Sequence, residues 1–218
     1  MEPVLRPEFL PDWMAAVVLL SLLLVIVSKE KFTYRFSVFI RLMSNSKYVL
    51  LFNKKQAYLH PFQFIWQIFA ILNTSLFLYL QKEQIASVFG NKAILNFSFA
   101  HILCFVAGFI LLKQLLQLLH AALFNNRKII EEFLFKKSSY FYYANLIFCV
   151  SNLISLFLVR DHMLLFFIPL ACVFTFTLVG WLVILRNRQK YISEQFFYFI
   201  LYLCALEIAP FLIIGSIL

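Results

Sequence analysis

The sequence has little charge and few residues that interrupt helices. Only 13% of its 218 residues are charged, against about 25% in a soluble domain, and 63% are hydrophobic. A single core of this size cannot bury so much apolar surface, so most of that surface must face lipid. The composition therefore excludes a soluble globular protein and predicts an all-α polytopic transmembrane helical bundle.

Signatures of catalysis are also absent. The sequence has no HExxH, GxSxG or GxGxxG motif and no Gly-rich phosphate-binding loop. Its cysteines, Cys104, Cys149, Cys172 and Cys204, lie one in each of the last four apolar runs, so neither a disulfide framework nor a zinc site is expected. We expect no enzymatic activity, no metal and no cofactor.

Two histidines leave an alternative open. His60 and His120 lie near the cytoplasmic ends of adjacent predicted spans, and a pair of histidines at matching depth is the arrangement that ligates haem. Both lie near the membrane interface rather than inside it, where water and backbone groups satisfy an imidazole. We therefore favour helix-end histidines over haem ligands.

Six apolar runs have the length that crosses a bilayer. We predict spans over residues 13–28, 61–80, 94–124, 140–159, 163–185 and 194–217 of a single transmembrane domain, residues 1–218. Residues 81–93 and 125–139 are expected to be loops. The third run exceeds the hydrocarbon thickness, so we expect it to tilt or to project from the membrane.

The basic residues predict the orientation. Fourteen Lys and Arg residues follow the first, third and fifth spans, whereas four lie in the N-terminal tail and in the loops after the second and fourth. By the positive-inside rule both termini lie outside the cytoplasm, the three basic loops lie inside it, and the chain is a multi-pass membrane protein. The net charge of +9 lies in short loops, which excludes nucleic-acid binding.

The largest segment between predicted spans, residues 29–60, contains an amphipathic pattern. Phe32, Phe36 and Phe39 fall on one helical face, and the same stretch carries the basic residues Arg35 and Arg41. An aromatic and basic helix of this kind is typical of one that lies on an anionic inner leaflet. A helix that docks on a partner protein has the same pattern, and both interpretations stay open.

The last apolar run carries an acid. Glu207 lies near its middle, and a carboxylate at that depth costs about 2.5–3.5 kcal/mol on insertion scales unless it has a polar or cationic neighbour. Lys113, Gln114 and Gln117 form a polar stripe on the third span and are the candidate partners. A structural tie between helices, a proton or ion relay and a contact with a partner subunit are the three interpretations.

Four stretches carry a family resemblance: the Asp12-Trp13 start of the first span, KFTYRFSVFIRLMS, PFQFIWQIFAILNTSLFLYL and FILYLCALEIAP. In these the chain resembles a family of Bacteroidota inner-membrane proteins known as domain of unknown function 4271. The resemblance implies a location in the bacterial inner (cytoplasmic) membrane and no assigned activity. With the orientation given by the basic residues, both termini of this multi-pass protein are then expected to be periplasmic. The resemblance also implies a link, by lineage, to the type 9 secretion and gliding machinery of that phylum.

These patterns favour a non-catalytic subunit or scaffold of a larger bacterial envelope complex. Polar side chains that could carry chemistry are scarce, and the cytoplasmic segments suit docking. The expected partners are the anionic inner leaflet and other membrane protein subunits, with no nucleic acid and no small-molecule substrate. The alternative is a small ion- or proton-coupled transporter that uses the intramembrane Glu207.

Overall fold

The structure is a computed structural model that describes residues 12–42, 60–90, 95–123, 127–157 and 163–187. Within these ranges the chain forms seven helices and no strand, which confirms the prediction of an all-α protein. The helices are α1 (Asp12–Lys31), α2 (Thr33–Ile40), α4 (Pro61–Leu80), α5 (Lys82–Phe89), α6 (Phe99–Leu123), α7 (Arg127–Phe157) and α8 (Met163–Asn187).

Five helices of the described ranges are long and apolar enough to cross a membrane. The candidate spans are Asp12–Lys31, Pro61–Leu80, Phe99–Leu119, Leu134–Phe157 and Met163–Gly180. They correspond to the first five spans predicted from the sequence, and they give the chain the architecture of a multi-pass membrane protein. The sixth predicted span, residues 194–217, lies outside the described residues.

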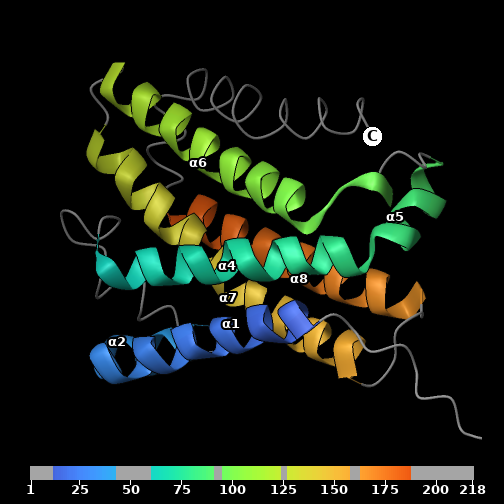
Figure 1. Cartoon of the computed structure of the whole chain (residues 1–218). Coiled ribbons are helices and arrows are strands. Elements are labelled where there is room, and N and C mark those ends of the chain that lie inside the picture. Colours follow the sequence, from blue (N-terminus) through green and yellow to red (C-terminus); the bar gives the residue numbers. More distant parts are fainter. Residues whose placement is uncertain (1–11, 43–59, 91–94, 124–126, 158–162, 188–218) are drawn as a thin grey trace, which may run out of the picture.

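Helices α4 and α7 occupy the centre of the bundle. Figure 1 shows α4 between α1 on one side and α6 on the other, with successive long helices running in alternate directions. In α4 and α7, 44% and 56% of the span residues are buried, against 11% in α6 and 22% in α1 and α8. Because α6 returns the chain between them, α4 and α7 run parallel.

Two segments predicted to be loops are partly helical. Helix α7 begins at Arg127, within the charged segment 125–139, and runs for 31 residues, none of which is Gly or Pro. Charge marks where a helix leaves the hydrocarbon, but it does not end a helix whose residues are good helix formers. Residues 82–89 of the segment 81–93 form α5, which ends at Gly90 with a left-handed φ of 70°.

Helix α2 lies within the segment 29–60, for which an interfacial amphipathic helix was predicted, and it extends α1. Phe32 separates the two helices, yet its amide donates to Ser28 O at 3.1 Å and its carbonyl accepts from the Phe36 amide at 2.8 Å. The hydroxyl of Thr33 also bonds to Lys29 O at 3.0 Å. The backbone bonding of α1 therefore continues across the junction, and α2 keeps a fixed position against the bundle.

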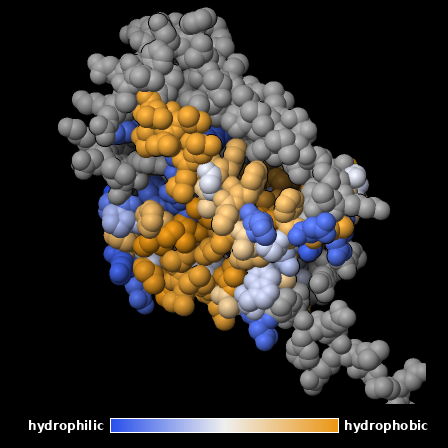
Figure 2. Space-filling model, turned by 45° about the horizontal axis from the view of Figure 1, so that its top comes forward, coloured by the Kyte–Doolittle hydropathy of each residue, from blue (hydrophilic) through white to orange (hydrophobic). Residues whose placement is uncertain are grey.

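The outer surface of the bundle is apolar. Figure 2 shows a broad hydrophobic area with hydrophilic residues toward its margins. The large exposed apolar side chains lie mainly on three helices and include Leu19, Leu23 and Ile26 of α1, Leu112 and Leu115 of α6, and Leu164, Ile168 and Phe174 of α8. A surface of this composition is stable against acyl chains and not in water.

Candidate functional site

A seam of uncharged polar side chains joins the two central helices along their length. Gln63, Asn73, Thr74 and Gln81 contribute from α4. The partners on α7 are Ser139, Asn145, Asn152 and Ser155. We call these eight residues the polar seam. Seven of them are buried and Thr74 is half-buried.

Four hydrogen bonds cross between the helices within the polar seam. They are Gln63 Nε2 to Ser139 Oγ at 3.0 Å, Thr74 Oγ1 to Asn145 Oδ1 at 2.8 Å, Asn152 Nδ2 to Asn73 O at 3.0 Å, and Gln81 Nε2 to Ser155 Oγ at 3.4 Å. Such bonds between membrane helices contribute about 0.6 kcal/mol each on average. Their main effect is to fix the register of α4 against α7, since a slip would leave buried amides without partners.

Three seam side chains also bond within their own helices. Asn73 Nδ2 donates to Phe69 O at 2.9 Å, and Asn145 Nδ2 donates to Phe141 O at 2.9 Å. The hydroxyl of Ser139 donates to Phe135 O at 2.7 Å while it accepts from Gln63. Most polar atoms of the seam are therefore engaged within the bundle, and Asn152 Oδ1 is a buried seam atom without a hydrogen-bond partner in the described part of the chain.

The predicted polar stripe on the third span lies on α6. Gln114 Oε1 accepts a hydrogen bond from Gln67 Nε2 of α4 at 2.9 Å, so this amide ties α6 to α4. Gln117 is buried, and Lys113 is half-buried with its Nζ 6.0 Å from the centroid of the Phe109 ring. Glu207, the predicted partner of the stripe, lies outside the described residues.

The aromatic face of α2 packs onto α4. The Phe39 ring lies 4.5 Å from that of Trp66 and 5.6 Å from that of Phe62, and Phe39 is only 1% exposed. Phe36 lies 6.2 Å from Trp66, measured between ring centroids. These aromatic side chains therefore contact the protein itself, and their packing on α4 buries apolar surface.

The remaining predicted contact residues of this segment are more accessible. Phe32 is half-buried and lies edge-on to the Phe62 ring at 5.9 Å, and Arg35 is half-buried beside His60. Arg41 is exposed. Among the residues predicted to contact lipid or a partner, Arg41 therefore stays exposed after α2 has packed on the bundle.

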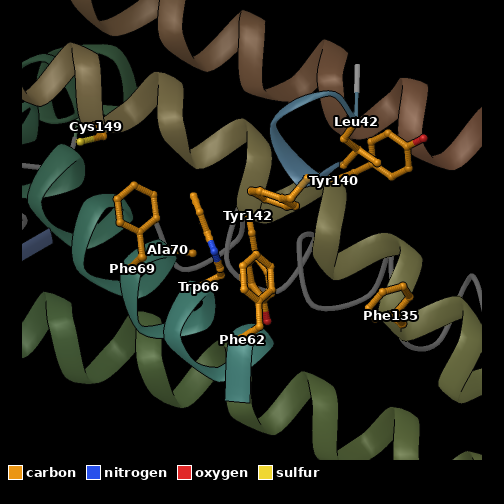
Figure 3. Packing of buried hydrophobic residues seen from close by; sticks show 10 residues of the cluster. Leu42, Phe62, Trp66, Phe69, Ala70, Phe135, Tyr140, Tyr142 and Cys149 are labelled. Carbon is orange, nitrogen blue, oxygen red and sulfur yellow. The ribbon is translucent and has the colours of Figure 1, made fainter. Parts of the chain in front are cut away.

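Figure 3 shows how the cluster behind α2 is assembled. Phe62, Trp66 and Phe69 project from α4 toward Tyr142 of α7, and Phe135 lies nearer the start of α7. The indole Nε1 of Trp66 is buried and has no hydrogen-bond partner in the part of the chain that the structure describes. The cluster therefore stabilises this end of the bundle by apolar and aromatic packing.

His60 caps the first turn of α4. Its Nδ1 accepts a hydrogen bond from the Phe62 amide at 3.1 Å, and Pro61 follows at the first helical position. Burial, and secondarily the charge of Arg35, lowers the pKa of His60 below its usual 6.5. The neutral imidazole is the form that can accept this bond, so the local electrostatics and the cap favour the same protonation state.

A pH dependence follows from this cap. Because the folded-state pKa of His60 lies below 6.5, its contribution to stability is present above pH 6.5 and is lost as the pH falls through the folded-state pKa. We expect His60→Ala to lower the unfolding free energy by about 1 kcal/mol at neutral pH. His60→Asn should retain the cap and lose the pH dependence. Thermal unfolding of purified protein between pH 5 and pH 8 measures both effects, and an unchanged acid dependence in His60→Asn would contradict the assignment.

The structure does not test the histidine pair considered for haem, because one of its two side chains is not described. His60 uses Nδ1 for its cap, and the side chain of His120 lies outside the described part. His101 bonds through Nδ1 to Ser98 Oγ at 2.6 Å, at the start of α6. Among the described residues, no three His, Cys, Asp or Glu side chains lie close enough to hold a metal ion.

A comparison with protein families matches residues 14–218 to the family described as Domain of unknown function (DUF4271). The chain belongs to this family. No curated protein and no solved structure matches it. The DUF4271 match begins within the first candidate span, covers the other four and continues through Glu207, so the polar seam and the last apolar run lie within the same family match.

The polar seam was not predicted from the DUF4271 sequence, although one signal for it exists. Asn145 and Asn152 lie seven residues apart in an apolar run, which places both on one helical face, and Ser138 precedes them by the same interval. A seven-residue repeat of polar residues inside a span indicates a helix–helix interface. The repeat does not identify α4 as the facing helix.

Proposed function

We propose that this chain is a non-catalytic integral inner-membrane subunit or scaffold of a larger bacterial envelope complex, linked to type 9 secretion or gliding machinery. The observation that carries the proposal is the polar seam. Side-chain hydrogen bonds from Gln63, Thr74 and Asn152 in the centre of the described bundle hold α4 to α7. That use of polar side chains suits a rigid membrane part better than a catalytic or transport pathway.

The surface of the bundle supports the same role. A transporter exposes polar groups to a water-filled cavity, whereas here the buried amides are bonded across a helix interface. The charged residues that stay exposed, such as Arg41, Glu83 and Lys29, lie at or near the ends of the described helices. The apolar side chains between the helix ends can contact other subunits within the membrane. The exposed charges at the helix ends can contact subunits outside the membrane.

Purification from its native membrane tests the proposal. An affinity tag on the chain, extraction in a mild detergent and mass spectrometry of the eluate should recover stoichiometric partner subunits. A control protein of similar size and span number, tagged and expressed to the same level, should not recover the same set. Isolation of the chain alone, in several mild detergents, would contradict a role within a complex.

One sequence observation favours transport as the second candidate. Glu207 lies within an apolar run of 25 residues, 194–218, and acids at such depth serve in ion and proton pathways. If the chain purifies alone, reconstitution in liposomes decides. Proton or sodium flux that Glu207→Gln abolishes would establish the transporter and overturn the scaffold.

A further inference from the structure

Ser151 of α7 carries a buried hydroxyl that does not follow the usual pattern of this bundle. Ser21, Ser75 and Ser139 each donate to a carbonyl oxygen of their own helix, at 2.6–2.8 Å. Ser151 is only 3% exposed, and its Oγ has no hydrogen-bond partner among the described residues. A hydroxyl left unbonded in apolar surroundings lowers stability, so this one favours a partner that the protein's own side chains do not supply.

Pro169 frees a backbone carbonyl on α8. It lies inside the helix and is buried. Proline has no amide hydrogen, so the carbonyl of Leu165, four residues earlier, loses the donor that it would have in a regular helix. The threonine hydroxyls of α8, on Thr175 and Thr177, bond within their own turns. In membrane helices such a carbonyl is satisfied by a neighbouring helix or by an ordered water.

The packing of α7 against α8 places Ser151 opposite Pro169. The two helices run antiparallel (Figure 1), and Gly180 lies so close to Tyr140 that an added Cβ would be 2.7 Å from the Tyr140 Cγ. Ser151 follows Tyr140 by eleven residues, and Pro169 precedes Gly180 by eleven. Eleven residues make about three helical turns and rise about 16 Å, so both residues return to the facing sides of their helices at the same level.

Aromatic contacts support this alignment and enclose the level at which the two residues meet. Tyr143 and Phe176 lie between the two pairs, with 6.1 Å between their ring centroids. Phe148 of α7 and Phe166 of α8 lie about one turn on either side of the level. Both belong to one buried cluster and stack on Phe77 of α4, at 4.4 and 6.3 Å between centroids. The hydroxyl and the freed carbonyl therefore lie among aromatic rings that offer them no hydrogen bond.

We propose that a single buried water molecule binds between α7 and α8, where it accepts a hydrogen bond from Ser151 Oγ and donates one to the Leu165 carbonyl freed by Pro169. Because Ser151 Oγ has no partner in the described ranges, Leu165 O included, the two groups are not bonded directly. A water bridges such a gap at little cost and makes two to four bonds in a buried site. Both neighbours are neutral, which suits water better than an ion. The inference is independent of the proposed function, since a scaffold and a transporter can both hold this water.

A double-mutant cycle tests whether the hydroxyl and the carbonyl share a partner. Pro169→Ala restores an amide that can donate to Leu165 O within the helix. We expect Ser151→Ala to lower the midpoint of thermal unfolding by about 2–4 °C when Pro169 is present, since the carbonyl then loses its partner. In the Pro169→Ala background the same change should leave the midpoint unaltered or raise it, because the carbonyl no longer needs the water.

Ser75→Ala is the matched control for the cycle. Ser75 is also fully buried, but it lies on α4 and its hydroxyl bonds to Ile71 O at 2.6 Å. Its replacement should therefore have the same effect with and without Pro169. An equal effect of Ser151→Ala in the two backgrounds would overturn the shared partner.

Radiolytic footprinting of the whole chain in detergent tests for the water itself and does not depend on the folding of Pro169→Ala. A short X-ray pulse converts water to hydroxyl radicals, which oxidise the side chains in contact with that water. Pro169 is buried and Phe148 is only 5% exposed, so bulk solvent does not reach them. We expect mass spectrometry to find both oxidised in the wild type and oxidised several-fold less in Ser151→Ala. Phe69, which is 1% exposed and lies in another cluster, should react equally in the two proteins.

Two footprinting results would overturn the bound water. In the first, Pro169 stays unmodified in the wild type, and in the second it is modified equally in Ser151→Ala. If the thermal cycle shows coupling while Pro169 stays unmodified, the hydroxyl bonds to the carbonyl directly, and that outcome overturns the water as well.

Discussion

Substitution of Gly180 by alanine is expected to destabilise the α7–α8 interface by about 1–3 kcal/mol, and substitution by leucine by more. A Cβ atom at position 180 would lie 2.7 Å from Cγ and 2.8 Å from Cβ of Tyr140. The Tyr140 Cβ is attached directly to the backbone, so the side chain cannot move away by changing its rotamer. The two helices would have to separate, and α8 packs more extensively on α7 than on any other described helix.

The matched control for this prediction is Gly108→Ala. Gly108 also lies within a spanning helix, α6, but a Cβ atom there would meet no atom within 4 Å. Since alanine is the better helix former, this change should leave stability unaltered or raise it by up to about 1 kcal/mol. Thermal unfolding in detergent, followed by the reaction of buried Cys149 with a thiol probe, measures both variants. Equal effects of the two changes would show that helix propensity, and not the contact with Tyr140, determines the result.

The positions of the membrane spans could be predicted from the sequence, but the ends of the helices could not. The first five predicted spans each correspond to a candidate spanning helix. Helix α7, however, begins at Arg127, before its apolar part at Leu134. The apolar part of a spanning helix ends where the hydrocarbon of the membrane ends. The helix itself ends where a capping residue, Gly or Pro interrupts its backbone hydrogen bonds. The two boundaries therefore differ wherever a helix projects from the membrane.

Contacts between helices were harder to predict than the helices themselves. The aromatic face of α2 was correctly placed on one side of a helix, yet lipid and a neighbouring helix are both apolar, and the sequence does not distinguish them. Phe39 lies in the core, against Trp66. The seam residues Asn145 and Asn152 show the same limit, since periodicity reveals a shared face and not the helix that it meets. Which helices pack against each other depends on the three-dimensional structure, and the hydrophobic pattern of a single sequence does not determine it.

Substitution of Trp66 by alanine is expected to cost about 3–5 kcal/mol and to release α2 from the bundle. Trp66 is 1% exposed, and its ring lies 4.5 Å from that of Phe39 and 5.1 Å from that of Phe69. Its removal leaves a cavity beneath α2, because rigid aromatic neighbours on α4 cannot collapse to fill it. Trypsin should then cleave after Arg35 faster than in the wild type, since Arg35 is half-buried while α2 is docked.

Two further variants separate the loss of packing from other effects of the Trp66 change. Phe64→Ala removes an aromatic ring from the same helix at a site that is 65% exposed, so we expect a change within about 0.5 kcal/mol and no faster cleavage. Trp66→Phe retains most of the apolar volume and removes an indole Nε1 that is buried without a hydrogen-bond partner in the described part of the chain. The loss of that desolvated donor offsets part of the lost volume, so Trp66→Phe should lie much closer to the wild type than Trp66→Ala. If Trp66→Phe were as unstable as Trp66→Ala, the indole nitrogen would have a bonding role that aromatic packing does not explain.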